Sequence, residues 1–212
     1  MATRVFLEVG QRRVFASAAD WPGWTRSGKD ENAAMEALAA AAPRYAAVPK
    51  AARIAFAPGT GFDVVERLPG DATTDFGAPS AIARAELKRL TKKDAGRLSA
   101  LVSASWTVLD RMVEKAPASL RKGPRGGGRD RDAVVEHVLG AETAYARKLG
   151  LRLKQPAAGD AAAVREHRNA IVAGLRAGTR GVTDEGWPAR YAARRIAWHA
   201  IDHAWEIEDR SE

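Results

Sequence analysis

The pattern of hydrophobic and polar positions changes along the chain, and its first part is typical of short strands. Apolar residues alternate or cluster at residues 4–10 and 13–19, and we expect these two runs to form a hairpin. Two further extended runs, at residues 52–57 and 62–67, are each followed by a Pro-Gly pair that is typical of turns.

One helix is expected within this first part. Residues 31–42 are rich in good helix formers, Asp30 is a suitable N-cap, and Pro43 ends the helical pattern. Residues 1–77 therefore predict a small α+β domain of short antiparallel strands plus one helix.

From Ser80 onward, apolar residues recur with helical periodicity. Four amphipathic helices are expected, and they lie before Pro117, after Asp130, between Asp160 and Gly178, and from about Pro188 to Asp209. Such a series of helices predicts a four-helix bundle over residues 80–212. The fold class is therefore expected to be α+β, with a sheet-containing N-terminal unit before the bundle.

A glycine-rich and basic segment separates the first two of these helices. Residues 120–131 (LRKGPRGGGRDR) predict a long exposed connection, and the chain as a whole has a formal net charge of +8. Basic loops of this kind can contact nucleic-acid phosphates without sequence preference, although a solvated connection is the commoner meaning. The cations in question are Arg121, Lys122, Arg125, Arg129 and Arg131.

The composition narrows the chemistry that the chain can perform. It has no cysteine, which excludes disulfides, protein thiolates and Cys-type zinc sites, so imidazole and carboxylate have to hold any metal. The motifs GxxxxGK[ST], GxGxxG and GxSxG are absent, which disfavours nucleotide hydrolysis and serine-hydrolase chemistry. Without a signal-peptide pattern or a long apolar run, we expect a cytoplasmic protein with no membrane partner.

Two of the four histidines, His199 and His203, lie four residues apart in the last expected helix. Positions i and i+4 share one helix face, so both imidazoles can converge on one ion. A third ligand has to come from another helix. His137 is favoured because it lies beside an apolar stripe, whereas charged neighbours place His167 near the surface. Three protein ligands and an open position are typical of catalytic metal sites.

The residues around these histidines have both structural and functional interpretations. Trp198 and Trp205, one heptad apart, fit core or interface positions better than the walls of a cofactor-binding pocket. Asp202 and Glu206 are candidate catalytic groups that orient an imidazole or transfer a proton. Carboxylates near a helix C-terminus are, however, usually only solvated, and paired histidines often serve as ordinary polar groups.

One histidine in the second helix (EHVLGAE, His137) and two in the last (WHAIDHAWE, His199 and His203) resemble the DinB family of metalloenzymes over residues 80–212. The resemblance implies that these three residues hold a divalent ion, typically zinc, nickel or iron. It also implies thiol-dependent transferase or isomerase activity. Family members often follow the last histidine with a small residue and a Gly-Gln-like pair, whereas this chain has Ala-Trp-Glu, so the substrate wall is expected to differ.

A weaker resemblance links residues 20–38 (DWPGWTRSGKDENAAMEAL) to HicB-like antitoxin domains. The Pro-Gly pair and Gly28 in this stretch fit turn positions. Trp21 and Trp24 are expected to cover the bundle or rim its site, which makes the N-terminal domain a lid or specificity element. No toxin partner is inferred.

The leading hypothesis is a divalent-metal-dependent enzyme, either a thiol transferase or a hydrolase. It would activate a small thiol or water for transfer, isomerisation or hydrolysis of a small-molecule substrate. The resemblance implies a low-molecular-weight thiol such as mycothiol, bacillithiol or glutathione, since the chain supplies no cysteine. A second copy of the chain is a further expected partner, and nucleic acid is less favoured. The alternatives are a nucleic-acid-linked regulator and a protein-interaction module without catalysis.

Overall fold

The computed structural model describes residues 2–123, 127–178 and 186–211. Its N-terminal part contains a four-stranded sheet in the order β3-β2-β1-β4, in which β1 is antiparallel to β2 and parallel to β4. The strands are β1 (Thr3–Val9), β2 (Val14–Ala18), β3 (Thr25–Gly28) and β4 (Phe62–Pro69). The predicted hairpin, the strand predicted at residues 62–67 and the mixed α+β class are confirmed. The expectation of antiparallel strands holds for β1, β2 and β3 but is wrong for β4, because the chain crosses over through the intervening helices and returns parallel to β1.

The helix predicted from residue 31 is confirmed as α1 (Glu31–Ala40), which packs against β2 and β3. Asp30 caps it as expected, because its side chain accepts a hydrogen bond from the Ala33 N–H. α1 ends before Pro43, which lies in the first turn of α2 (Ala42–Tyr45). A proline is tolerated there because its missing N–H would have had no helical partner. A further short helix, α3 (Ala47–Ala51), follows.

The strand predicted at residues 52–57 is wrong. Arg53 turns the chain with a φ of 56°, and residues 54–57 have no regular structure. Phe56 packs edge-on against the rings of Trp21, Trp24 and Tyr45. The alternating pattern therefore reflects the partly buried side chains of Ile54 and Phe56, which pack against the core from an irregular segment.

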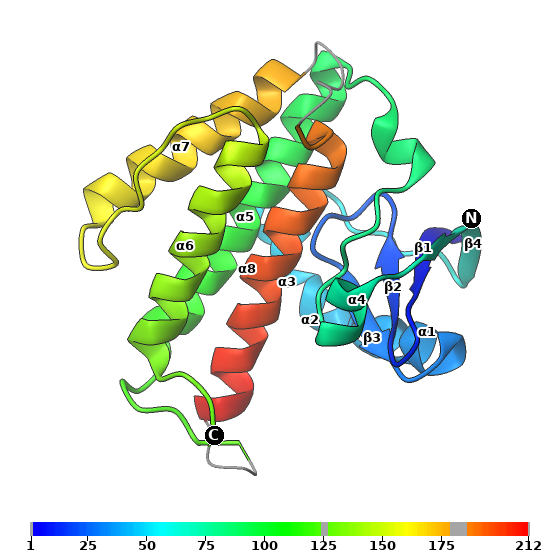
Figure 1. The fold of residues 1–212 in the computed structure, drawn as a ribbon, viewed down its shortest axis with the longest axis horizontal. Coiled ribbons are helices and arrows are strands. Elements are labelled where there is room, and N and C mark those ends of the chain that lie inside the picture. The colour runs from blue at the N-terminus through cyan, green and yellow to red at the C-terminus, as the bar shows by residue number, and fades with distance from the viewer. Residues whose placement is uncertain (1, 124–126, 179–185, 212) are drawn as a thin grey trace.

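Four long helices follow in the places that the periodicity predicts: α5 (Lys92–Lys115), α6 (Arg131–Lys148), α7 (Ala161–Ala177) and α8 (Ala189–Ser211). The short helix α4 (Ala72–Phe76) and the 3-10 turn η1 (Arg84–Leu87) lead from the sheet to α5. Figure 1 shows α8 running beside α5 and α6, on the side that faces the sheet. Residues 120–123 and 127–130 are non-helical, as expected, and residues 124–126 lie outside the described residues.

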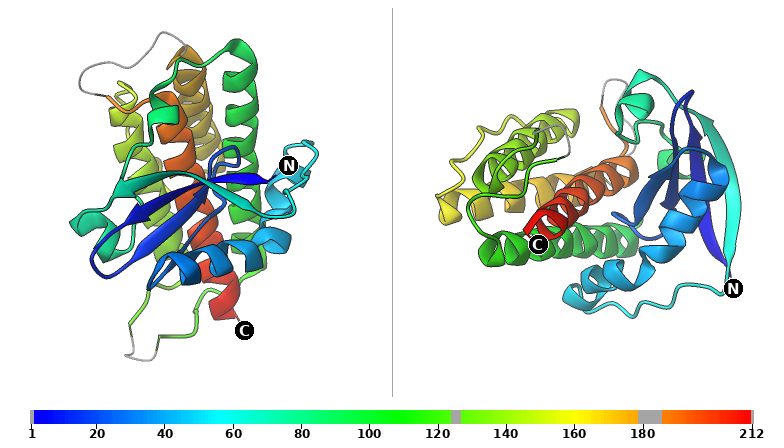
Figure 2. Two further views of the ribbon diagram at one scale, coloured as in Figure 1. Left: turned by 90° about the vertical axis from the view of Figure 1, so that its right-hand side faces the viewer. Right: turned by 90° about the horizontal axis from the view of Figure 1, so that it is seen from below.

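The sheet and the long helices share one hydrophobic core. A single cluster of buried residues extends from β1, β2 and α1 to α5, α6 and α8, and Figure 2 shows the sheet lying along one side of the helices. Phe15 of β2 meets Trp198 of α8 edge-on, with 6.1 Å between ring centroids. The division into domains at residues 1–77 and 80–212 stays a prediction. None of the described helices is long and apolar enough to cross a membrane.

Candidate metal centre

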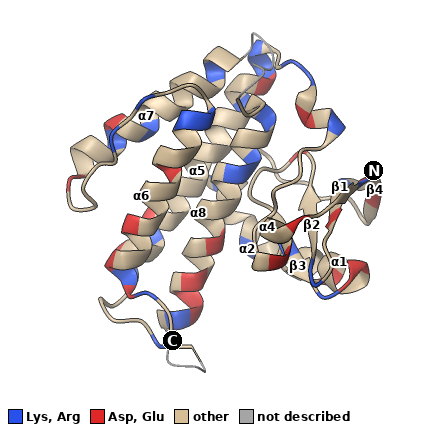
Figure 3. Ribbon diagram, in the orientation of Figure 1, with Lys and Arg blue, Asp and Glu red and all other residues tan. Residues whose placement is uncertain are grey.

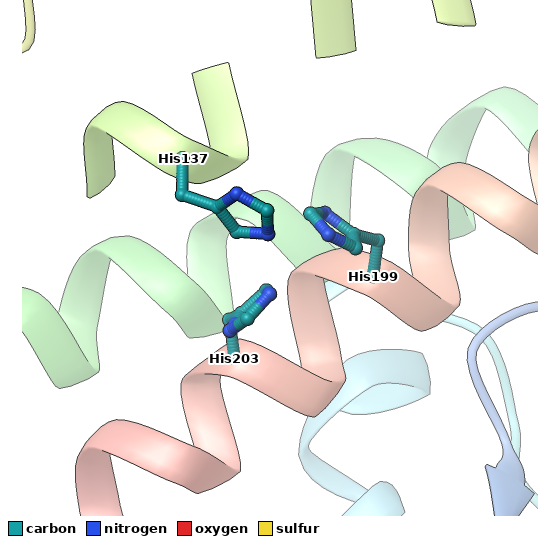
Figure 4. A group of neighbouring side chains, drawn as sticks. All are labelled: His137, His199 and His203. Atoms are coloured by element: carbon teal, nitrogen blue, oxygen red, sulfur yellow. The ribbon is translucent and has the colours of Figure 1, made fainter. Parts of the chain in front are cut away.

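The structure brings His137, His199 and His203 together. His199 and His203 share one face of α8, and α6 lies alongside so that His137 faces them, as Figure 4 shows. One ligand nitrogen from each of the three rings lies within 4.8 Å of the other two. The ring centroids are 4.5 Å apart for His199 and His203, and 5.1 and 4.9 Å from His137 to those two rings.

Burial lowers the pKa of two of the three imidazoles and so favours their neutral form. His199 is only 7% exposed. Burial, reinforced by the neighbouring His203 and His137, lowers the pKa of His199 well below its usual value. Burial also lowers the pKa of the partly exposed His137. Both imidazoles are therefore neutral at neutral pH, which leaves a nitrogen lone pair for an ion.

The hydrogen bonds of the cluster leave donor atoms free for a metal. The Nδ1 atom of His199 is buried and has no hydrogen-bond partner. The Nδ1 atom of His203 contacts the Glu206 carboxylate at 2.7 Å, so the opposite nitrogen of that ring remains available. Buried polar atoms in proteins are rarely left unpaired. The three-imidazole donor set and the orphaned nitrogen fit a borderline-soft divalent ion.

The separations are also compatible with such an ion. Zinc holds imidazole nitrogens at about 2.1 Å, which places two ligand nitrogens about 3.4 Å apart in a tetrahedral site. Nitrogens that are up to 4.8 Å apart have to move closer on binding. Rotation of the His137 side chain can supply this movement, because that side chain is partly exposed.

The two candidate catalytic carboxylates lie in different surroundings. Glu206 contacts His203 and also pairs with Arg210, with 2.7 Å between its Oε1 and the arginine nitrogen. A carboxylate on the outer nitrogen of a ligand histidine is the usual way to fix the orientation of such a ring. Asp202 instead pairs with Arg26 of β3 at 3.2 Å, and burial raises its pKa. Catalytic roles for both residues stay predictions.

The two tryptophans of α8 contact the N-terminal part of the molecule. The ring of Trp205 contacts the guanidinium groups of Arg26 and Arg44, which are 4.8 and 5.0 Å from its centroid. Trp198 contacts Phe15 on one side and has the His199 ring at 5.9 Å. These contacts support the core interpretation, and a role for either ring as a pocket wall stays a prediction.

His167 does not join the cluster, and the expectation that it lies near the surface is wrong. It is 6% exposed, and its Nε2 has no hydrogen-bond partner. The charged residues beside it in the sequence suggested that His167 is exposed to solvent. Helical periodicity instead turns Glu166 outward and His167 inward, toward the segment Leu153–Pro156. Burial lowers the pKa of His167 below its usual value.

Trp21 and Trp24 do not rim the histidine cluster. Trp24 is buried, stacks on Tyr45 and donates its indole N–H to the Leu38 carbonyl. Trp21 packs against Phe56, and Arg97 of α5 covers its ring at 4.6 Å. These rings belong to the core of the N-terminal part and to its contact with α5.

Two residues beside the cluster were missed from the sequence. The Tyr145 ring lies edge-on to His199 at 5.7 Å, and Arg195 lies four residues before His199 on the same helix face. The spacing of 195, 199 and 203 was a usable signal for Arg195. The sequence pattern assigns Tyr145 to the apolar stripe of α6, and this assignment gives no indication that its ring contacts an imidazole.

Several cations of the connection between α5 and α6 interact within the molecule. Arg121 donates to the Asp209 carbonyl, Lys122 pairs with Asp130 at 2.7 Å, and Arg131 contacts Asp132 at 2.8 Å. Figure 3 shows acidic and basic residues intermixed at this end of α6 and α8. Arg125 lies outside the described residues. The described part of this segment therefore presents no purely cationic surface to a phosphate backbone.

Comparison of the chain with family models, with curated proteins and with solved structures found no match. The interpretation of the histidine cluster accordingly depends on its geometry and chemistry.

Proposed function

We propose that this protein is a divalent-metal-dependent enzyme of the DinB-like class, with the ion held by His137, His199 and His203. The observation that carries the proposal is the buried, unpartnered Nδ1 of His199 within a cluster of three imidazoles. Buried polar groups without partners are uncommon, and a neutral imidazole in such a cluster has a nitrogen lone pair that can coordinate a metal ion.

The order of the helices supports the DinB-like assignment. One histidine comes from α6, the second long helix, and two come from α8, the fourth. This is the distribution that the resemblance implies for a four-helix bundle of that family. The N-terminal part packs against Trp198, Asp202 and Trp205, which lie on a neighbouring face of α8. It therefore leaves the histidine face to α6.

The residues of the chain have separable roles in this proposal. A divalent ion supplies Lewis-acid chemistry that makes a small thiol or a water more acidic, for transfer, isomerisation or hydrolysis. Glu206 fixes the orientation of His203, and Arg210 in turn holds Glu206. Because the chain has no cysteine, any thiol has to come from a low-molecular-weight cofactor.

Elemental analysis of untagged protein purified without chelators tests this proposal. We expect about one zinc, nickel or iron per chain, lost in a His199→Ala/His203→Ala variant that keeps its helical circular dichroism. His167→Ala is the matched control, because that histidine is buried but lies outside the cluster. A parent protein that stays empty after incubation with each metal would contradict the proposal.

The alternative is a nucleic-acid-linked or protein-interaction module without catalysis. It would be favoured by a chain that binds no metal, and for nucleic acid by an affinity that falls steeply with salt. The internal pairing of Arg121, Lys122 and Arg131 weighs against the nucleic-acid form.

A further inference from the structure

Arg195 is a buried arginine that has no anionic partner among the residues that the structure describes. It is 8% exposed, and its Nη1 atom is buried with no hydrogen-bond partner. No ion pair joins Arg195 to any residue in the described part of the chain. Arginine is always charged in proteins, so its burial without a carboxylate is costly.

Arg194, the residue before Arg195, is a buried arginine of the same helix that does have an anionic partner. Arg194 pairs with Glu86 at 2.6 Å, and both side chains are 6% exposed. Arg194 also donates to the Ala81 carbonyl at 2.7 Å. Arg194 is therefore fully engaged with η1 and the segment before it, whereas Arg195, one position along α8, points to a different environment.

That environment adjoins the candidate metal centre. The Arg195 guanidinium lies over the Trp198 ring at 4.6 Å and near the Tyr145 ring at 5.5 Å. Tyr145 also contacts His199, which lies one helical turn from Arg195. Aromatic faces stabilise a cation, but they do not satisfy the N–H groups at the edge of its plane.

We propose that Arg195 binds the carboxylate of the enzyme's substrate, which makes the substrate a small carboxylic acid with an apolar or aromatic body. This inference rests on the proposed function, because it takes the three histidines as the reaction centre. A carboxylate is planar and monoanionic, so it matches one guanidinium in charge and accepts two parallel hydrogen bonds. A phosphate dianion would need more positive charge than this single unpaired cation offers.

The neighbouring aromatic residues fit the body of such a molecule. Trp187, two residues before α8, contacts the rings of Tyr145 at 5.1 Å and Tyr191 at 4.8 Å, and Tyr145 in turn contacts Arg195. Of these, Tyr145 and Trp187 are partly exposed. A small acid placed here would present its carboxylate to Arg195 and its remaining atoms toward the histidines.

Calorimetric titration of the full chain, treated with a chelator, with benzoate and with its neutral analogue benzamide tests the inference. We expect benzoate to bind at least about tenfold more tightly than benzamide, and Arg195→Met to remove at least about tenfold of the benzoate affinity. Arg195→Lys keeps the charge but loses the planar fork, so its affinity should be intermediate. Arg97→Met is the matched control, because Arg97 also covers a tryptophan ring, but its contacts are with Trp21 and the Asp20 carbonyl of the N-terminal part.

Equal binding of benzoate and benzamide, or unchanged benzoate affinity in folded Arg195→Met and Arg195→Lys, would overturn the inference. Zinc titration of the same samples tests the proposed metal-dependent function independently of the carboxylate site. Zinc binding with Arg195-independent benzoate binding removes only the carboxylate site. Arg195-dependent benzoate binding without zinc binding retains that site and removes the metal-dependent reaction.

Discussion

Two adjacent arginines of α8 differ in the partners that the fold gives them. Arg194 has its charge neutralised by Glu86, and Arg195 has only aromatic faces and an unpaired Nη1. Removing one member of a buried ion pair leaves the other charge buried alone, whereas removing an unpaired buried charge relieves a desolvation cost. The two side chains should therefore respond in opposite ways to the same substitution.

We predict that Arg194→Met lowers the free energy of unfolding by about 3 kcal/mol or more. Arg195→Met should leave it within about 1 kcal/mol of the parent value or raise it, since the lost cation–π contacts are offset by removal of a buried charge. Urea denaturation followed by circular dichroism measures both. A loss in Arg195→Met as large as in Arg194→Met would show that Arg195 is structural.

At the scale of the element, α8 sorts its side chains by helical position. His199 and His203 meet α6, whereas Asp202 and Trp205 meet cations of the N-terminal part. Glu206 lies three residues after His203 and contacts the His203 ring. Asp202 directly precedes His203 in the sequence, but its side chain points away from that ring and contacts Arg26. One helix therefore carries two carboxylates with different partners.

Glu206→Gln is expected to lower zinc affinity by about tenfold or more, because the ligand histidine loses its anionic partner. Asp202→Asn has the same change of charge on the same helix and should alter zinc affinity by less than about threefold. Competition with a zinc-binding dye measures both affinities. Equal losses would indicate a general effect of charge and not a contact with His203.

At the scale of the whole molecule, the sheet and the long helices depend on each other. The buried cluster runs through both, and polar contacts reinforce it: Arg26 with Asp202, Arg44 with Asp209, and the Tyr191 hydroxyl with the Ser80 carbonyl. Neither part buries its apolar surface fully without the other, so their stabilities are coupled.

We predict one cooperative unfolding transition for the metal-free chain. The midpoints in urea from helical circular dichroism and from tryptophan fluorescence should coincide, because Trp24 reports on the N-terminal part and Trp198 on its contact with α8. Separate midpoints would show that residues 1–77 and 80–212 unfold as independent domains.

Local periodicity was sufficient to predict most of the elements. The hairpin, the helix after Asp30 and the four long helices follow from the spacing of apolar residues and from caps, which act within a few residues along the chain. The pairing of His199 and His203 was predictable for the same reason, since a separation of four residues sets a common helix face. The preference for His137 came from the apolar stripe of its own helix and from the charged neighbours of His167, and the second argument failed because His167 is buried.

Contacts between distant parts of the chain could not be predicted in this way. Residues 52–57 have the pattern of a strand, but β1 takes β4 as its parallel neighbour and leaves them unpaired. His167 has charged neighbours in sequence and is nevertheless buried against Leu153–Pro156. The different partners of Asp202 and Glu206 depend on where Arg26 lies, 176 residues before Asp202.

The sequence by itself determined the order of the hairpin, α1 and the four long helices, the pair of histidines on α8 and the exclusion of thiolate chemistry, because these depend on residue type and short-range spacing. Only the tertiary structure decided that His137 closes the cluster and that, within the described residues, the His199 Nδ1 has no partner and Arg195 has no counter-ion. Whether a buried polar atom is paired depends on which side chains from distant segments reach it, and this is settled by packing.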